Sequence, residues 1–177
     1  MAPSLSDNPP DADAPTASDS PRRGASLDSA ANEAIELMFF AYRDFTDVAD
    51  RILAQHDLGR AHHRALYFVG TGQDVTVGHL LDTLNITKQS LARVLRRLID
   101  LGLVVQEVGA VDRRQRLLRL SGEGDALLQE LIEAQRRLLR EAFTEAGTER
   151  LEGFRRVMLA IMNEEDSARF NRRKRVR

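Results

Sequence analysis

Residues 87–120 read TKQSLARVLRRLIDLGLVVQEVGAVDRRQRLLRL, a helical pattern followed by two short apolar runs on either side of a polar turn. Between Ile86 and Arg119 there are eight Lys or Arg residues and three acidic residues, whereas the whole chain has a formal net charge of −1. Basic charge concentrated on one short element of a nearly neutral protein is typical of a surface that meets phosphates. The stretch therefore predicts a helix and a basic β-hairpin that bind nucleic acid.

The residues before and within this helix predict a helix-turn-helix. Thr76 is a candidate N-cap for a short helix over 77–84. After a break at Asn85-Ile86, Thr87 caps a longer helix that ends near Leu101. Apolar residues at i, i+3, i+4 and i+7 form the buried stripe of that helix: Leu91, Val94, Leu95 and Leu98. Two helices joined by a short turn form a helix-turn-helix, whose second helix can enter a DNA major groove.

The polar side of the longer helix carries the candidate DNA contacts, which are Thr87, Lys88, Gln89, Ser90, Arg93, Arg96 and Arg97. Because Arg can bind guanine O6 and N7 together and Gln can bind adenine N6 and N7, we expect Lys88, Gln89 and Arg93 to meet base edges. The free N–H groups of the first turn suit a phosphate oxygen, and Arg96 and Arg97 are expected to hold the DNA backbone. The alternative is an ordinary solvated charged face.

The second half of the stretch predicts a β-hairpin. Gly102 suits the left-handed end of the helix, and the strands are expected over 103–108 and 116–120. Arg at the tip would be drawn into a narrow minor groove by its negative potential, although Asp-Arg-Arg is also an ordinary turn composition. The candidate contacts of this wing are Asp112, Arg113, Arg114 and Arg116.

The flanks of this region are expected to be helical, with a tail at each end. All five prolines lie within the first 21 residues, so residues 1–27 are expected to be disordered. Helices are expected from Asp28 to about Gln55, from Arg60 to Val69, from Ser121 to a break at Gly147-Thr148, and from Leu151 to about Glu165. The basic residues of 167–177 are expected to form a second disordered tail. The expected fold is mainly α with a small β-hairpin.

Composition excludes several classes of protein. The chain has no Cys, which removes disulfides, thiolate metal sites and thiol redox sensing. We expect a cytoplasmic protein without a membrane span, because no apolar run approaches the roughly 20 residues that a span needs and no secretory signal is evident. We find no Gly-rich phosphate loop, no His-Glu metal spacing and no nucleophile motif, so we expect neither an enzyme nor a cofactor.

Several motifs in order resemble those of the MarR family of bacterial winged-helix transcriptional regulators. The matching residues are Val75-Thr76-Val77, Ile86 to Arg93, Leu101 to Val104, Asp112-Arg113-Arg114, and Leu120 to Gly124. The resemblance implies a homodimer on a pseudo-palindromic operator, with dimerisation helices over 28–57 and 122–166 around a winged helix-turn-helix over 58–121. It also implies that Arg114 enters the minor groove and that Asp112 orients nearby arginines. The chain departs from the family pattern at Gln106 and Glu107, where a basic residue is common, and at Arg116, where an apolar residue is usual.

A small-molecule site is a further expectation. Six of the nine aromatic residues fall between residues 39 and 68, close to two histidines. Proteins that resemble this chain often bind small aromatic or phenolic anions, and the candidate pocket residues here are Tyr42, Phe45, His62, His63 and Phe68. The alternative is that these aromatics form core and dimer interface. No metal site is expected, because adjacent histidines on a helix face apart.

A helical adaptor that binds only protein is the main alternative function. Such an adaptor would use its arginines for solubility and would show no salt-dependent binding to duplex DNA. RNA binding is disfavoured, since no strand carries the aromatic residues on which bases could stack.

Overall fold

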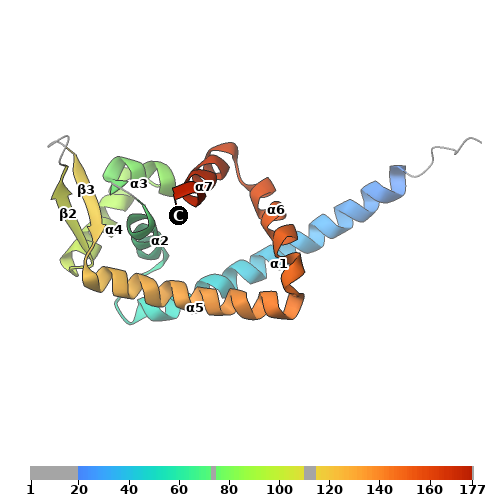
Figure 1. Cartoon of the computed structure of the whole chain (residues 1–177), viewed down its shortest axis with the longest axis horizontal. Coiled ribbons are helices and arrows are strands. Elements are labelled where there is room, and N and C mark those ends of the chain that lie inside the picture. Colours follow the sequence, from blue (N-terminus) through green and yellow to red (C-terminus); the bar gives the residue numbers. More distant parts are fainter. Residues whose placement is uncertain (1–19, 73–74, 110–114, 177) are drawn as a thin grey trace, which may run out of the picture. The chain divides into compact units, whose positions relative to one another are not determined.

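The structure, a computed structural model, describes residues 20–72, 75–109 and 115–176 (Figure 1). Its elements are α1 (Ser20–Ala54), α2 (Arg60–Thr71), β1 (Val75–Thr76), α3 (Val77–Leu84), α4 (Lys88–Asp100), β2 (Val104–Val108), β3 (Arg116–Leu120), α5 (Gly122–Ala146), a 3-10 turn (Thr148–Arg150), α6 (Leu151–Ile161) and α7 (Glu164–Val176). The chain divides into two units, 1–42 and 43–177. Within the described ranges, no helix combines the length and apolarity that a membrane span requires. The predicted fold, mainly α with a small β-hairpin, is confirmed.

Three helices begin at the N-caps expected from the sequence. Thr76, Thr87 and Ser121 each accept a hydrogen bond from the backbone N–H three residues further on, at 3.1, 3.2 and 3.0 Å. A side chain at this position satisfies one of the N–H groups that a helix start leaves without a partner. The break between α3 and α4 is equally local, because Asn85 adopts a left-handed conformation with φ 50°. Gly102 has φ 70° after α4, as predicted.

The sheet has three antiparallel strands in the order β1-β3-β2. The predicted hairpin is present, with Val104 opposite Leu120 and Val108 opposite Arg116. The strand β1 was not expected from the sequence. It pairs Val75 with Leu118 of β3 and so joins the start of α3 to the base of the hairpin.

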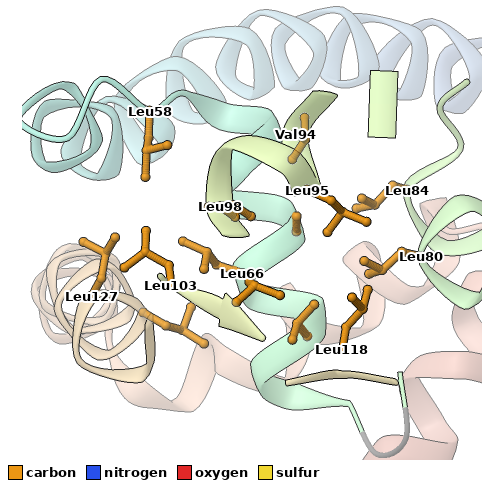
Figure 2. Close-up of a cluster of buried hydrophobic side chains, with 14 of the residues drawn as sticks. Leu58, Leu66, Leu80, Leu84, Val94, Leu95, Leu98, Leu103, Leu118 and Leu127 are labelled. Carbon is orange, nitrogen blue, oxygen red and sulfur yellow. The ribbon is translucent and has the colours of Figure 1, made fainter. Parts of the chain in front are cut away.

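A leucine-rich core lies between the helices and this sheet (Figure 2). Leu66 on α2, Leu98 on α4 and Leu118 on β3 are each at most 2% exposed. The start of α5 lies so close to the segment between α4 and β2 that a Cβ at Gly124 would come within 1.9 Å of the Leu103 carbonyl oxygen. The core therefore holds the helix-turn-helix, the hairpin and α5 as one packed body.

The N-terminal boundary differs from the prediction. Helix α1 begins at Ser20, whereas disorder was expected up to residue 27 and a helix only from Asp28. Pro21 lies in the first turn of α1, where a missing N–H costs nothing and the fixed φ suits a helix. Disorder is therefore expected at most for residues 1–19, which lie outside the described residues.

The C-terminal boundary differs as well. The helix from Leu151 ends at Ile161, and the tail over 167–177 that we expected to be disordered forms most of α7. Asn163 caps this helix, because its Oδ1 accepts from the backbone N–H of Asp166 at 2.8 Å. The three acidic residues of the first turn suit the positive end of the helix dipole, and the basic residues that follow suit the negative end. These local signals outweigh the polar composition that suggested disorder.

Candidate nucleic-acid interface

The helix α4 has one buried and one exposed side, as its sequence predicts. Leu91, Val94, Leu95 and Leu98 are between 0% and 7% exposed and pack into the core. Thr87, Lys88, Gln89, Ser90, Arg93 and Arg96 are exposed. Because the apolar stripe fixes the rotation of α4 about its axis, these polar residues form a continuous surface on its outer side.

The arginines of α4 differ in their surroundings. Neither Arg93 nor Arg96 forms a salt bridge with another residue of the described ranges. Arg97 instead lies against the turn between α1 and α2, with its Nη2 3.5 Å from the His56 carbonyl oxygen and 3.9 Å from an Asp57 carboxylate oxygen. Arg93 and Arg96 are thus available to a phosphate or a base, whereas Arg97 contacts its own chain.

Arg64, which the sequence did not single out, positions the helix-turn-helix. Its Nη2 donates a hydrogen bond to the carbonyl oxygen of Leu84 at 2.9 Å and so caps the end of α3 from α2. The next residue, Asn85, makes the left-handed turn into α4. A charged donor on the last carbonyl of a helix is favourable both as a hydrogen bond and toward the helix dipole. Arg64 therefore fixes the turn from which the recognition helix begins.

Of the four candidate wing residues, one lies within the described ranges. Arg116 is exposed at the start of β3. The tip residues Asp112, Arg113 and Arg114 lie outside the described residues. Glu107, one of the departures from the family pattern, forms a salt bridge with Arg119 across the hairpin, with 2.7 Å between Oε2 and Nε. This pair offsets the negative charge that Glu107 places on the wing.

Comparison with known proteins agrees with this geometry. A sequence model of the MarR family matches residues 56–115, which include α2, the helix-turn-helix and β2. The chain is also 52% identical over 136 residues to the HTH-type transcriptional regulator PetP of Rhodobacter capsulatus, covering 77% of this chain and 82% of that protein. The chain belongs to the MarR family of transcriptional regulators.

Solved MarR structures share this fold. One MarR family transcription regulator superposes with a TM-score of 0.67 at 16% identity, covering 77% of this chain and 91% of its own. Staphylococcus aureus MarR, solved in complex with salicylate and kanamycin, gives a TM-score of 0.64 at 20% identity and covers 77% of this chain and 93% of its own. The winged-helix arrangement is therefore that of MarR-family proteins.

The expected pocket residues of this MarR-family chain lie in different surroundings. Tyr42 belongs to the first unit and is 61% exposed, whereas Phe45 and Phe68 belong to the second unit and are partly buried. Phe68 packs against the core and meets the Tyr67 ring edge to face at 5.4 Å between centroids. Two cavities among the described residues of the second unit, of about 490 and 350 Å³, are lined by other residues.

The two histidines of α2 have separate structural surroundings. The Nδ1 atom of His62 accepts a hydrogen bond from the backbone N–H of Gly59 at 3.1 Å, at the start of α2. Burial lowers the pKa of His62, and the nearby positive charge of Arg97 lowers it further. Burial likewise lowers the pKa of His63, whose buried Nε2 has no hydrogen-bond partner among the described residues. Both side chains are therefore expected to be neutral near pH 7.

Proposed function

We propose that this MarR-family protein binds double-stranded DNA sequence-specifically, as a homodimer on a pseudo-palindromic operator. The observation that carries the proposal is the exposed polar side of α4, with Lys88, Gln89, Arg93 and Arg96 opposite a fully buried apolar stripe. Lys88, Gln89 and Arg93 suit base edges in a major groove, and Arg96 suits a phosphate. In the wing, Arg114 would reach the adjacent minor groove, Asp112 would orient the nearby arginines, and Arg113 and Arg116 would add contacts to the DNA backbone. This function needs no catalytic step.

Exposed apolar surface supports the homodimer. In α6 and at the residue that follows it, six apolar residues are between 41% and 59% exposed: Leu151, Phe154, Val157, Met158, Ile161 and Met162. In the first unit, Ile35, Met38 and Phe39 are between 46% and 72% exposed. Apolar faces of this extent mark an interface, and a two-fold dimer is the commonest way to cover them. Light scattering at micromolar concentration should give twice the chain mass of 19.9 kDa.

DNA titration and footprinting test the proposal. We expect tight binding that weakens steeply with salt, and protection of roughly 20 base pairs with dyad symmetry and half-site centres about one helical turn apart. Protection of a single asymmetric half-site would contradict the dimeric arrangement. Binding that is absent, or that does not change with salt, would favour the protein-binding adaptor instead.

A small aromatic anion is the proposed effector class. Staphylococcus aureus MarR has been solved with salicylate, and Phe45, His62, His63 and Phe68 of this chain supply the aromatic rings and imidazole nitrogens that such an anion would need. Salicylate should raise the melting temperature of the protein and release it from DNA, since a ligand that binds one state stabilises that state. Phe45→Ala should weaken both effects. Unchanged melting temperature and DNA binding at millimolar salicylate would leave these aromatics with a packing role alone.

A further inference from the structure

Helix α7 is docked on the helix-turn-helix through Arg169. The Nη1 atom of Arg169 donates a hydrogen bond to the carbonyl oxygen of Asp82 in α3 at 3.1 Å, and the side chain is only 22% exposed. Its Nη2 atom lies 2.5 Å from a carboxylate oxygen of Glu165, one turn earlier in α7. Arg169 therefore joins the acidic start of α7 to the last turn of α3, and Figure 1 shows the two helices beside each other.

The docked part of α7 faces the start of the recognition helix across a cavity of about 490 Å³. The cavity is lined by α3 and the turn that follows it, by Lys88 at the start of α4, and by Glu165 and Arg169 on α7. A recognition helix reads bases with its N-terminal residues, so the DNA strand that carries those bases passes close to the same place. Lys88, one of the candidate base contacts, therefore shares this space with α7.

The docked part of α7 is negatively charged, as DNA is. The first turn of α7 carries three acidic residues, Glu164, Glu165 and Asp166. Residues 164–171 hold one basic residue, Arg169, so three acids against one Arg give this segment a net charge of −2. Phosphates that approach Lys88 would be repelled by this segment, because like charges brought together oppose association. The docked helix and a DNA strand therefore suit each other poorly at the start of α4.

We propose that docked α7 is an autoinhibitory element, which covers the start of the recognition helix and must undock before DNA can bind. The proposal rests on the proposed DNA-binding function and assigns a regulation to that same surface. The contact that holds α7 is small, with one charge-assisted hydrogen bond to a backbone carbonyl and the ion pairs around Arg169. A contact of this size favours the docked form by about tenfold and lowers the apparent affinity for DNA by a similar factor. Tightly bound DNA can therefore displace the helix.

Arg169→Ala in the full-length protein tests the proposal, with Arg136→Ala as its matched control. Each substitution removes an Arg that pairs with a glutamate on its own helix, but of the two, only Arg169 has a hydrogen bond to α3 among the described residues. Removal of a cation ordinarily weakens DNA binding, so loss of a charge and release of a cover change the affinity in opposite directions. Arg169→Ala should bind the footprinted duplex about three- to tenfold more tightly than wild type. Arg136→Ala should bind it no more tightly than wild type.

A reversible cross-link tests the docked form directly. The chain has no Cys, and Asp82 and Glu165 line the same cavity, so Asp82→Cys with Glu165→Cys gives one pair that a reducible bismaleimide can join. A denaturing gel identifies the product that is linked within one chain. The cross-link should lower the affinity for DNA at least about tenfold, and cleavage of its spacer should restore the affinity although the sulfur atoms stay modified. Saturating duplex, added first, should reduce the yield of the cross-link.

Three outcomes would overturn the proposal. Arg169→Ala that binds DNA only as tightly as wild type, or less tightly, would remove the autoinhibitory role and leave the proposed function intact. Cross-linked protein that binds as tightly as the cleaved protein would do the same. Absence of salt-dependent binding by wild type and Arg169→Ala alike would overturn the proposed function together with the role of α7. Circular dichroism and light scattering confirm that each variant keeps the fold and the oligomeric state of wild type.

Discussion

Arg97 in the recognition helix donates a hydrogen bond to the carbonyl oxygen of His56, 41 residues earlier in the chain, at 3.5 Å. The same guanidinium lies 3.9 Å from a carboxylate oxygen of Asp57, so it is held at the turn that connects α1 to α2. Arg93, one turn earlier on α4, is exposed and forms no salt bridge with a described residue. The two arginines are therefore expected to act differently, Arg97 on the position of α4 and Arg93 on DNA.

Arg97→Ala should lower the free energy of unfolding by less than about 1 kcal/mol, because the contacts that it loses are long and partly exposed. It should reduce affinity for the operator only a few-fold and leave the salt dependence unchanged. Urea unfolding and DNA titration at several salt concentrations check both expectations. If the salt dependence instead showed that about one counterion fewer per subunit is released from the DNA, Arg97 would hold a phosphate, as its position in the sequence suggests.

Arg93→Ala and Arg114→Ala should weaken DNA binding in different ways. Loss of Arg93 should cost about 1–3 kcal/mol and relax base preference at one position in each half-site. Loss of Arg114, in the wing, should weaken binding to most sequences, flatten the salt dependence and reduce the preference for A·T flanks. Competition titrations with single-base operator variants separate the two effects. Equal, sequence-independent losses would mean that α4 holds only the DNA backbone.

Thr87→Ala should destabilise the start of the recognition helix. The Oγ1 atom of Thr87 accepts from the backbone N–H of Ser90 at 3.2 Å, and loss of such a cap costs about 0.5–2 kcal/mol. Thr87→Ser keeps an acceptor at the same place and is expected to unfold at nearly the wild-type urea concentration. Similar destabilisation by both substitutions would assign the effect to the lost methyl group.

Gly124→Ala should destabilise the fold strongly, whereas Gly122→Ala should not. A Cβ at Gly124 would meet the Leu103 carbonyl oxygen at 1.9 Å, which is backbone and can yield only by moving α5. We expect a loss of about 1–3 kcal/mol or more. Gly122 lies in the same first turn with no atom within 4 Å of the added Cβ, so Ala there should be neutral or stabilising by up to about 1 kcal/mol. Thermal and urea unfolding of the two variants compare them directly.

Stability should fall as the pH drops below 6.5, in part because of His63. Burial lowers the pKa of folded His63 from its ordinary value of 6.5, so the unfolded chain binds the proton first as the pH falls. The contribution of His63 to the free energy of unfolding is therefore fully present above pH 6.5. It is lost as the pH falls from 6.5 to the lowered pKa of the folded protein. His63→Phe should flatten the loss of unfolding free energy between pH 8 and pH 5.5, measured at one protein concentration. A pH profile that His63→Phe leaves unchanged would show that the burial of His63 does not contribute to it.

Much of the helix-turn-helix could be predicted from the sequence because its signals are local. The caps at Thr76, Thr87 and Ser121 act within three residues, and the buried stripe of α4 repeats every three or four. The hairpin over β2 and β3 was equally readable from two apolar runs and a polar turn. The sequence alone therefore determined which side of α4 is exposed and which residues it presents.

The tertiary structure alone decided how these elements are held together. Strand β1 is two residues long, too short for any periodicity, and forms only because β3 offers it a partner. Arg64, Arg97 and Arg169 all donate to backbone carbonyl oxygens far along the chain, those of Leu84, His56 and Asp82. Every residue carries such a carbonyl, so no residue type marks the acceptor, and only the folded chain brings donor and acceptor together.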